Sequence, residues 1–295
     1  MHLDGYVALA GLLVGFVVGL TGMGGGALMT PILVVVFNVQ PLAAVSSDLA
    51  AAVVMKPVGG GVHLRRGTVH MGLVKWMCLG SVPSAFAGVL VLKNLGRPAD
   101  VQDRVSLVLG IALLVAASAI VAKAIVQRGR LHEGHVRDIV IRKLPTVLIG
   151  VAGGLVVGMT SVGSGSLMIV LLLLLYPRLK ASQLVGTDLV QAIPLVASAA
   201  FGHILFGDFE LSLTTSLLIG SIPGVYVGAR TSARAPDQVI RPALVLVLVL
   251  SGLKLLKVSN GWLGATLAGG LLILGVMGVR ALRAAKAKEP AIVSS

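Results

Sequence analysis

The sequence alternates long apolar runs with short polar segments, and this pattern restricts the chain to a fold that spans a membrane. A straight helix needs about 20 residues to cross the hydrocarbon core of a bilayer. Nine runs approach or exceed this length, at residues 5–37, 43–62, 69–92, 105–126, 144–176, 184–205, 211–230, 238–257 and 261–282. With 56% hydrophobic and 12% charged residues, the composition lies outside that of soluble domains. We therefore predict an all-α polytopic membrane protein.

Several function classes are disfavoured by the same composition. The net charge of +13 could indicate a nucleic-acid partner, but the basic residues lie in short segments between apolar runs, where they orient a membrane protein. The single cysteine, Cys78, excludes a disulfide framework and a thiolate metal cluster. No Ser-His-Asp order and no proteolytic aspartyl pair stands out. We expect no nucleic-acid partner, no cofactor, no bound metal and no enzyme activity.

The two longest runs, 5–37 and 144–176, belong to an internal repeat. Each is too long for one straight crossing, too short for two comfortable ones, and interrupted by glycine and serine. Sliding the chain along itself tests for repetition. An offset of 139 superimposes the two interruptions, and an offset of 140 pairs Asp48 with Asp188, His63 with His203, Gly80 with Gly220 and Pro83 with Pro223. Shared Gly, Pro, Asp and His positions indicate a true duplication.

The repeat and the flanking charges together predict how the chain is organised. We expect a first transmembrane repeat over 1–127, a basic cytoplasmic linker over 128–143, a second repeat over 144–257, and an extra C-terminal helix with a basic tail over 258–295. Basic residues mark cytoplasmic loops. Suppose that each long run enters and leaves the membrane on the same side and that the two repeats have opposite orientations. The basic residues then lie on the side of the linker, except for Lys254 and Lys257. If each broken run instead crossed the membrane, this pattern would degrade.

The preferred arrangement is therefore two inverted repeats. Each would be a broken, re-entrant-like helix hairpin plus three spanning helices, followed by the extra C-terminal helix. This topology puts the N-terminus outside and the C-terminus in the cytoplasm.

The interruptions, GLTGMGGGAL at 19–28 and GMTSVGSGSL at 158–167, predict a ligand site. Backbone groups freed by a broken helix are costly in hydrocarbon unless protein or a wet cavity receives them. The short helices that follow, 27–37 and 166–176, would begin inside the membrane, and a helix N-terminus attracts anions. We predict two opposed anion-binding turns. Their candidate substrate-binding residues are Thr21, Gly22, Gly24, Gly25, Gly26, Thr160, Ser161, Gly163, Ser164, Gly165 and Ser166.

A plainer reading of membrane glycines is close helix packing through small residues four apart. Gly11, Gly15 and Gly19 have that spacing, and we assign them to packing. In the two interruptions, clustering and duplication favour a functional role instead.

Ionisable residues within spans are the next signal, because charge in a membrane is costly. Asp48 and Asp188 occupy matching places and are candidates for coupling to H⁺ or Na⁺, although an acid near a helix N-terminus also acts as a cap. Lys56, which has no counterpart in the second repeat, would balance an anionic substrate or extend toward the cytoplasm. Further candidates are Gln191 for substrate contact and His63 and His203 for coupling, against the plainer view that the histidines simply end spans.

At these residues the sequence resembles the sulfite exporter TauE/SafE family of bacterial permeases. The motifs that carry the resemblance are GLTGMGGGALMTPIL, AVSSDLAA, HLRRGTV with GSVPSAFAG, and GTDLVQAIPLVASAAFGHILFGDFELSLTTSLLIGSIPGVYVGART, and the similarity covers about 8–257. The resemblance implies passage of small sulfur-containing anions across the bacterial inner membrane, with the glycine-rich motifs at the translocation site. The second motif, SVGSGS, is poorer in glycine than the first.

We therefore expect an inner-membrane exporter of sulfite, sulfoacetate or other organosulfonates. It would work by alternating access, with the anion at the midplane between the two breaks. A passive anion channel, a non-transporting membrane sensor or assembly protein and, more remotely, an intramembrane enzyme are the alternatives. The partners expected are the anion, the lipid bilayer and a coupling H⁺ or Na⁺, and the glycine-rich faces permit a homodimer without requiring one.

Overall fold

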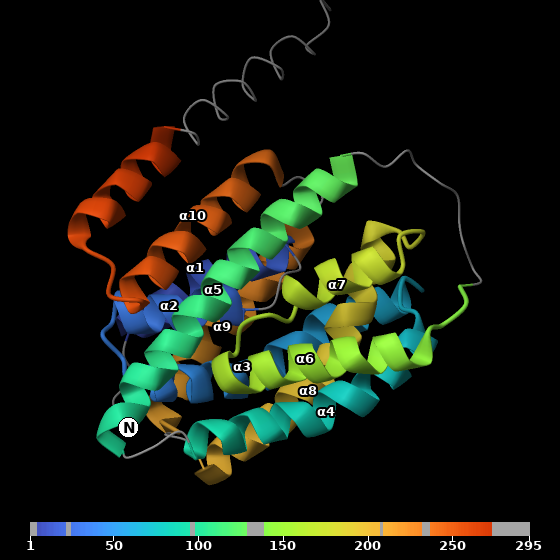
Figure 1. Cartoon of the computed structure of the whole chain (residues 1–295), viewed down its shortest axis with the longest axis horizontal. Coiled ribbons are helices and arrows are strands. Elements are labelled where there is room, and N and C mark those ends of the chain that lie inside the picture. Colours follow the sequence, from blue (N-terminus) through green and yellow to red (C-terminus); the bar gives the residue numbers. More distant parts are fainter. Residues whose placement is uncertain are drawn as a thin grey trace, which may run out of the picture.

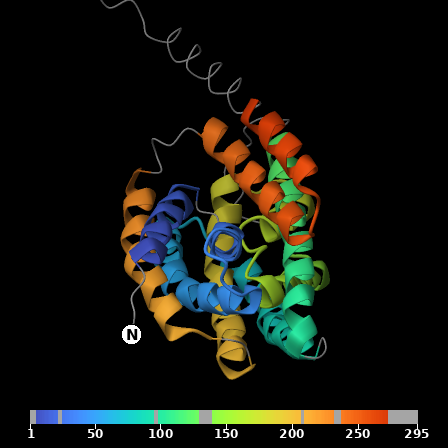
Figure 2. The same cartoon turned by 90° about the vertical axis from the view of Figure 1, so that its left-hand side faces the viewer.

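The computed structural model is a bundle of long and short helices (Figures 1 and 2). It describes residues 5–21, 25–94, 98–128, 139–206, 209–231 and 237–272. Residues 260–272 form a helical segment after the last labelled helix. The labelled helices are α1 (Gly5–Thr21), α2 (Gly26–Val35), α3 (Pro41–Arg65), α4 (Met71–Lys93), α5 (Pro98–Arg128), α6 (Lys143–Thr160), α7 (Leu167–Leu175), α8 (Ala181–Phe206), α9 (Leu211–Thr231) and α10 (Asp237–Leu255).

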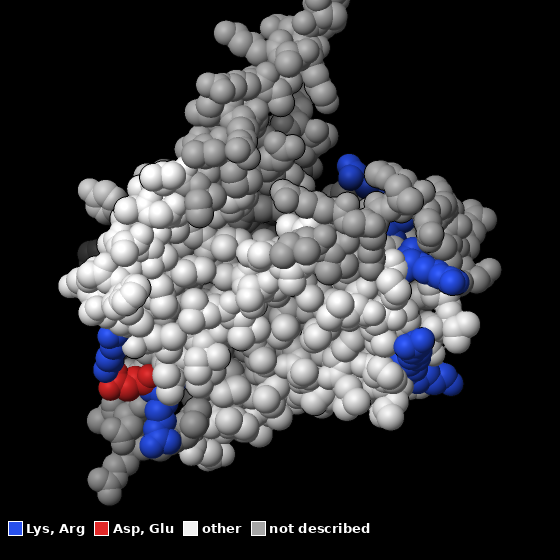
Figure 3. Space-filling model, turned by 45° about the horizontal axis from the view of Figure 1, so that its top comes forward, with Lys and Arg blue, Asp and Glu red and all other residues white. Residues whose placement is uncertain are grey.

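Among the residues that the structure describes, six segments are long and apolar enough to cross a bilayer. They are Pro41–Arg65, Met71–Lys93, Val101–Ala122, Lys143–Thr160, Ser182–Phe206 and Leu211–Gly228. The face drawn in Figure 3 is largely uncharged, and its Lys and Arg side chains gather toward opposite sides of the molecule. An uncharged belt between charged margins is what a bilayer requires of the surface it covers. The predicted class, an all-α polytopic membrane protein, is confirmed.

Both long apolar runs are broken where the sequence predicts. The first is divided into α1 and α2, and the second into α6 and α7, with α2 and α7 only 10 and 9 residues long. The hydroxyl of Tyr176, directly after α7, accepts a hydrogen bond from the backbone N–H of Arg142, directly before α6, at 2.9 Å. The α6–α7 hairpin therefore starts and finishes at the same end of the bundle.

The α1–α2 hairpin starts and finishes at the opposite end. Lys254 at the end of α10 donates to the carbonyl oxygen of Val35 at the end of α2, at 3.3 Å. Three residues further on, Lys257 pairs with Asp103 near the start of α5, at 3.3 Å. We call this end, where α3 begins and α4 and α8 finish, the far end. We call the other, where α3 finishes and α4 and α6 begin, the linker end.

Helices of the two predicted repeats pack in exchanged pairs. The first helix of each hairpin lies on the fourth helix of the other repeat, so α1 packs on α9 and α6 packs on α4. Glycines bring these backbones together: a Cβ built on Gly15 would lie 2.6 Å from the carbonyl oxygen of Ser221, and one on Gly11 2.8 Å from that of Leu217. The packing role predicted for these two glycines is confirmed. The second helix of each hairpin packs on the fifth helix of the other repeat, α2 on α10 and α7 on α5.

Corresponding helices of the two repeats run antiparallel where they meet. Ser46, near the start of α3, is 2.9 Å from His203, near the finish of α8. At the other end of this pair, a Cβ on Gly186 would lie 3.0 Å from the ring of His63. This is the relation that inverted repeats require. Inversion across the bilayer and the boundaries of the four predicted segments remain predictions.

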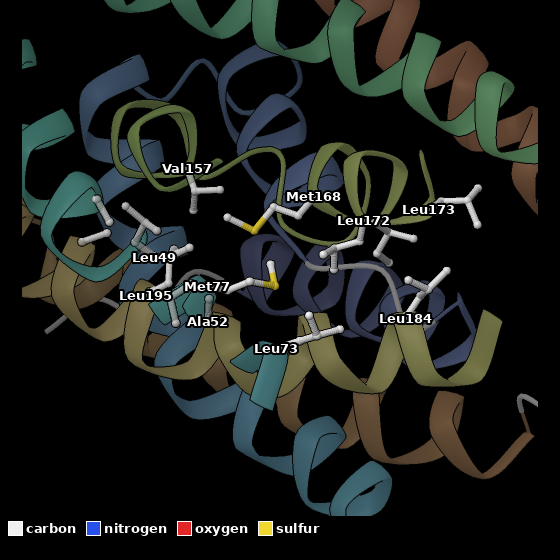
Figure 4. Packing of buried hydrophobic residues seen from close by; sticks show 14 of the residues in the cluster. Leu49, Ala52, Leu73, Met77, Val157, Met168, Leu172, Leu173, Leu184 and Leu195 are labelled. Carbon is white, nitrogen blue, oxygen red and sulfur yellow. The ribbon is translucent and has the colours of Figure 1, made fainter. Parts of the chain in front are cut away.

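Side chains from both repeats form one apolar cluster beside the second helix break (Figure 4). Leu49 of α3, Met77 of α4, Met168 of α7 and Leu195 of α8 are all fully buried there. A membrane-spanning bundle gains little hydrophobic free energy from burying side chains that lipid would also solvate, so close packing supplies the stability. This cluster holds the short helix α7 against the helices around it.

Gly220 and Gly61 provide a matched test of the exchanged packing. Alanine at Gly220 would overlap the carbonyl oxygen of Ala8, whereas nothing lies within 4 Å of a Cβ on Gly61. We expect Gly220→Ala to destabilise the bundle by about 1–3 kcal/mol, the usual range for overpacking. Gly61→Ala should be neutral or slightly stabilising, since alanine favours a helix. Thermal unfolding of both purified variants in detergent measures the difference, and equal midpoints would contradict this account of the α1–α9 interface.

Candidate functional site

The two helix breaks meet inside the bundle. Gly26, the first residue of α2, lies so close to the second break that a Cβ there would overlap the carbonyl oxygen of Ser161. Both residues are buried. The start of α2 and the second break are therefore in backbone contact, and glycine is required at Gly26 for the two backbones to touch.

The second break is a turn of unusual backbone conformation. Ser161 caps α6 in the left-handed region with φ of 59°, and Gly163 and Gly165 have φ of 120° and 90°. Only glycine adopts the last two angles without strain. The hydroxyl of Thr160 donates to the carbonyl oxygen of Val156 at 2.7 Å and accepts from the N–H of Val162 at 3.2 Å. Thr160 thus satisfies backbone groups that the break exposes.

Asp48 of α3 lies directly beside the point of contact. Its Oδ2 accepts hydrogen bonds from the hydroxyls of Thr30 in α2 and Ser161 in the second break, each at 2.7 Å. One carboxylate oxygen thereby joins the two breaks. Its other oxygen, Oδ1, is buried and has no hydrogen-bond partner among the described residues.

Lys56, two turns further along α3, reaches the same break. Its ammonium group donates to the hydroxyl of Ser164 at 2.6 Å, and the side chain is buried. Asp188 and Asp48 are its electrostatic partners. The alternative in which Lys56 extends to the cytoplasmic surface is therefore wrong for this structure.

Asp188 and Gln191 of α8 form the continuation of this polar cluster. The amide nitrogen of Gln191 donates to Asp188 Oδ1 at 3.3 Å and contacts the sulfur of Met168. The amide oxygen of Gln191 accepts from the hydroxyl of Ser81 in α4, at 3.1 Å. Gln191 therefore connects the acid of the second repeat to the first repeat.

The two candidate histidines lie in different surroundings. The ring of His203 is buried between Ser46 of α3 and the carbonyl oxygen of Gly158 in α6, at 2.9 and 2.8 Å. His203 therefore connects the second repeat to α3 of the first repeat, at Ser46, which lies two residues before Asp48. The ring of His63 is only half-buried and pairs with the nearby hydroxyl of Thr68 at 2.8 Å, so it lies outside the cluster.

The helices that start at the breaks have no side-chain cap. Gly25 precedes α2 and Ser166 precedes α7, and neither provides a capping hydrogen bond. The first turn of any helix leaves N–H groups without intrahelical partners. The hydroxyl of Ser166 is buried and, like Asp48 Oδ1, lacks a partner in the described part of the chain. These are the groups that a small polar ligand could engage.

The structure brings most predicted site residues together but does not describe all of them. Gly22 and Gly24 lie outside the described residues, as does the side chain of Thr21. Three contributors were not predicted: Thr30, Ser81 and Met168. Ser81 and Met168 belong to the duplicated segments, which was an available signal, whereas nothing local distinguishes Thr30 from other membrane threonines. Across the described ranges, no three His, Cys, Asp or Glu side chains gather as a metal site.

The arrangement defines a polytopic membrane protein with a buried polar site where two broken helices meet, a construction typical of transporters. The family model for Sulfite exporter TauE/SafE matches residues 7–255. The chain belongs to this family. Among curated relatives, "Probable membrane transporter protein YjnA" of Bacillus subtilis (strain 168) is 37% identical over 254 residues, covering 85% of this chain and 98% of the relative.

A second relative, "Probable membrane transporter protein YdhB" of the same organism, is 25% identical over 254 residues, covering 85% of this chain and 99% of the relative. No solved structure matches the chain significantly. The chain is therefore a multi-pass membrane protein of a transporter family.

Neighbouring glycines test the contact between the breaks. Gly26→Ala would force the two backbones apart, whereas the atom nearest to an alanine Cβ at Gly25 would be the flexible end of Met55, at 3.4 Å. We expect Gly26→Ala to lower the thermal midpoint clearly, since overpacking costs about 1–3 kcal/mol, and Gly25→Ala to leave it nearly unchanged. Differential scanning fluorimetry of both variants would check this, and tolerance of Gly26→Ala would refute the contact.

Proposed function

We propose that the chain carries small sulfur-containing anions, such as sulfite, sulfoacetate or other organosulfonates, across the bacterial inner membrane. The family is named for sulfite export, and two relatives are named as membrane transporters. Export is the direction that the family name suggests for this chain.

The meeting of the two breaks is the observation that carries this proposal. The first residue of α2 lies against the second break, from which α7 begins, and a helix N-terminus carries a partial positive charge that favours anions. Lys56 adds a full positive charge within hydrogen-bonding distance of Ser164. An oxyanion between the breaks would find backbone N–H groups, the hydroxyl of Ser166 and this ammonium group. Thr21, Gly22 and Gly24 stay candidates from the sequence.

The orientation follows from charge. At the linker end, the described charged side chains are basic: Arg65, Arg66, Lys75, Arg142, Lys143, Arg178, Lys180 and Arg230. Acids are described at the far end, where Asp103 and Glu210 accompany Lys93, Arg104, Lys254 and Lys257. Basic residues concentrate on the cytoplasmic side of membrane proteins. We therefore assign the linker end and the C-terminus to the cytoplasm and the N-terminus to the outside.

Alternating access would then use moving units that differ from the two sequence repeats. Because glycine contacts fasten α1 to α9 and α6 to α4, each pair moves as one body. The two bodies would rock about α3 and α8, which pack against one another and carry Asp48, Lys56 and Asp188. The anion at the breaks would become accessible first from one end and then from the other.

Spin-label distances test these moving units. Leu9 in α1, Ile219 in α9 and Leu148 in α6 are exposed positions for labels once Cys78 is replaced by serine. We expect the Leu9–Ile219 distance to stay constant on addition of a transported anion and the Leu9–Leu148 distance to change. Double electron–electron resonance measures both distances. The reverse result would indicate that the moving units are the two sequence repeats.

The transport proposal is tested by flux. Purified protein in proteoliposomes is offered sulfite, sulfate, thiosulfate, sulfoacetate, taurine and acetate, and saturable flux of a sulfur anion is expected. Unsaturable currents far above carrier turnover would indicate the channel alternative. Binding without flux would indicate a sensor or assembly protein.

A lysine pair tests the role of the buried ammonium group. Lys56→Met removes the charge at the breaks at similar volume, while Lys93→Met removes an exposed charge at the far end. We expect Lys56→Met to weaken anion affinity by about tenfold or more, equivalent to about 1.4 kcal/mol, and Lys93→Met to have little effect. The concentration dependence of flux gives both affinities, and equal values would remove Lys56 from the site.

A further inference from the structure

We propose that Asp48 carries a proton that crosses the membrane together with the anion, and that this proton resides on Oδ1. The inference rests on the proposed transport function. It deepens that function by naming the coupling ion and the atom that holds it.

The two oxygens of the Asp48 carboxylate have different surroundings. Oδ2 accepts from Thr30 and from Ser161, each at 2.7 Å, and so its acceptor capacity is used within the protein. Oδ1 is buried without a hydrogen-bond partner in the described chain. Buried polar atoms are normally hydrogen-bonded, and an exception at a ligand site calls for an explanation. Oδ1 lies toward the first break, 3.9 Å from the position of a Cβ built on Gly25.

Charge explains why the anion needs the proton. The charged group that acts on Asp48 is Lys56 on its own helix, and the second electrostatic partner of this lysine is Asp188 on α8. His203 approaches α3 at Ser46, two residues earlier. The helices α2 and α7 contain no charged residues. The charged residue of α6 is Lys143, at the start of that helix. Two carboxylates therefore face one ammonium group, and an anion beside ionised Asp48 would be repelled.

Protonation removes this repulsion and creates a donor. A proton binds a lone pair of Oδ1, so that the carboxylate becomes a neutral carboxylic acid. The new O–H donates to an oxygen of the anion at the first break, while Oδ2 keeps its bonds from Thr30 and Ser161. When the anion leaves on the other side, the proton leaves to water and the carboxylate is restored. The net charge of the site is therefore the same when it holds one proton and one monovalent anion as when it is empty.

The surroundings of Oδ1 favour a proton over a metal cation. Hard cations bind clusters of oxygen ligands. Around the Cβ built on Gly25, the methyl group of Met55 lies at 3.4 Å, and Asp48 Oδ1 and a methyl group of Val18 each lie at 3.9 Å. An apolar neighbour and one free oxygen suit a proton, which needs a single lone pair.

Proteoliposomes with imposed pH or Na⁺ gradients test the inference. If one proton moves with each monovalent anion, a pH difference of one unit supports about a tenfold anion concentration ratio. We expect the wild-type protein to accumulate the anion with a pH gradient and not with a Na⁺ gradient. A pH indicator inside the vesicles should report proton entry with the anion. Anion flux that ignores the pH gradient would overturn the inference while leaving transport intact, whereas no flux of any anion would remove the proposed function itself.

Two asparagine variants locate the proton. Asp48→Asn imitates the protonated state, so we expect anion exchange to continue while accumulation driven by the pH gradient is lost. Asp103→Asn is the control, because it removes an exposed acid at the far end, outside the polar cluster, where Asp103 pairs with Lys257, and it should keep the coupling. Retention of coupling in Asp48→Asn would overturn the assignment.

Infrared difference spectroscopy gives a readout that does not depend on transport by the variants. Addition of anion to wild-type protein should produce the carbonyl stretch of a protonated carboxylic acid. Asp48→Glu, which keeps a titratable carboxyl group, should shift this band, and Asp48→Asn should abolish it. Absence of the band in the wild-type protein at saturating anion would overturn the inference even if an asparagine variant failed to fold.

Discussion

The structure depends on the contact between two broken helices in an environment that tolerates few unsatisfied backbone groups. A helix break exposed to lipid would leave N–H and C=O groups without partners. Here the start of α2 lies on the carbonyl of Ser161, and the break after α6 is supported by Thr160. The start of α2 and the second break thus shield one another, and Thr160 satisfies backbone groups of the second break. The same contact places the N-terminus of α2 at the second break, so in the proposed mechanism the feature that satisfies the backbone also attracts the anion.

Electrostatics explains why the polar residues around the breaks are arranged in a chain. Isolated charge is costly in a membrane interior, so buried charges have partners. Asp48 is held by two hydroxyls, Lys56 by Ser164, and Asp188 by Gln191. In the proposed mechanism, one more anion enters a cluster that already contains two acids and one base, and a proton on Asp48 compensates for it. The pairing within the protein and the coupling to a proton then have one physical origin.

The exchanged packing gives the site its rigidity on each side. Backbones in contact through Gly15 and Ser221, or through Gly154 and Ser81, leave no side-chain layer between them that could slide. Mobile interfaces are then expected elsewhere, along α3 and α8. Because these two helices carry the charged residues of the cluster, any movement between the bodies would change the surroundings of the site directly.

The sequence by itself determined the class, the broken runs and most residues of the buried polar cluster. The length of the apolar runs left only a membrane fold, and the duplication marked Asp48 and Asp188, with helix capping left open as a plainer role. The sequence left two positions open for Lys56, because a lysine within a span can face a substrate or extend to the cytoplasmic surface. Only the tertiary structure decided that Lys56 turns inward to Ser164, that Thr30 joins Asp48, and that each hairpin packs on the other repeat. These facts depend on contacts between residues more than one hundred positions apart, or between different helices, and no local pattern encodes them.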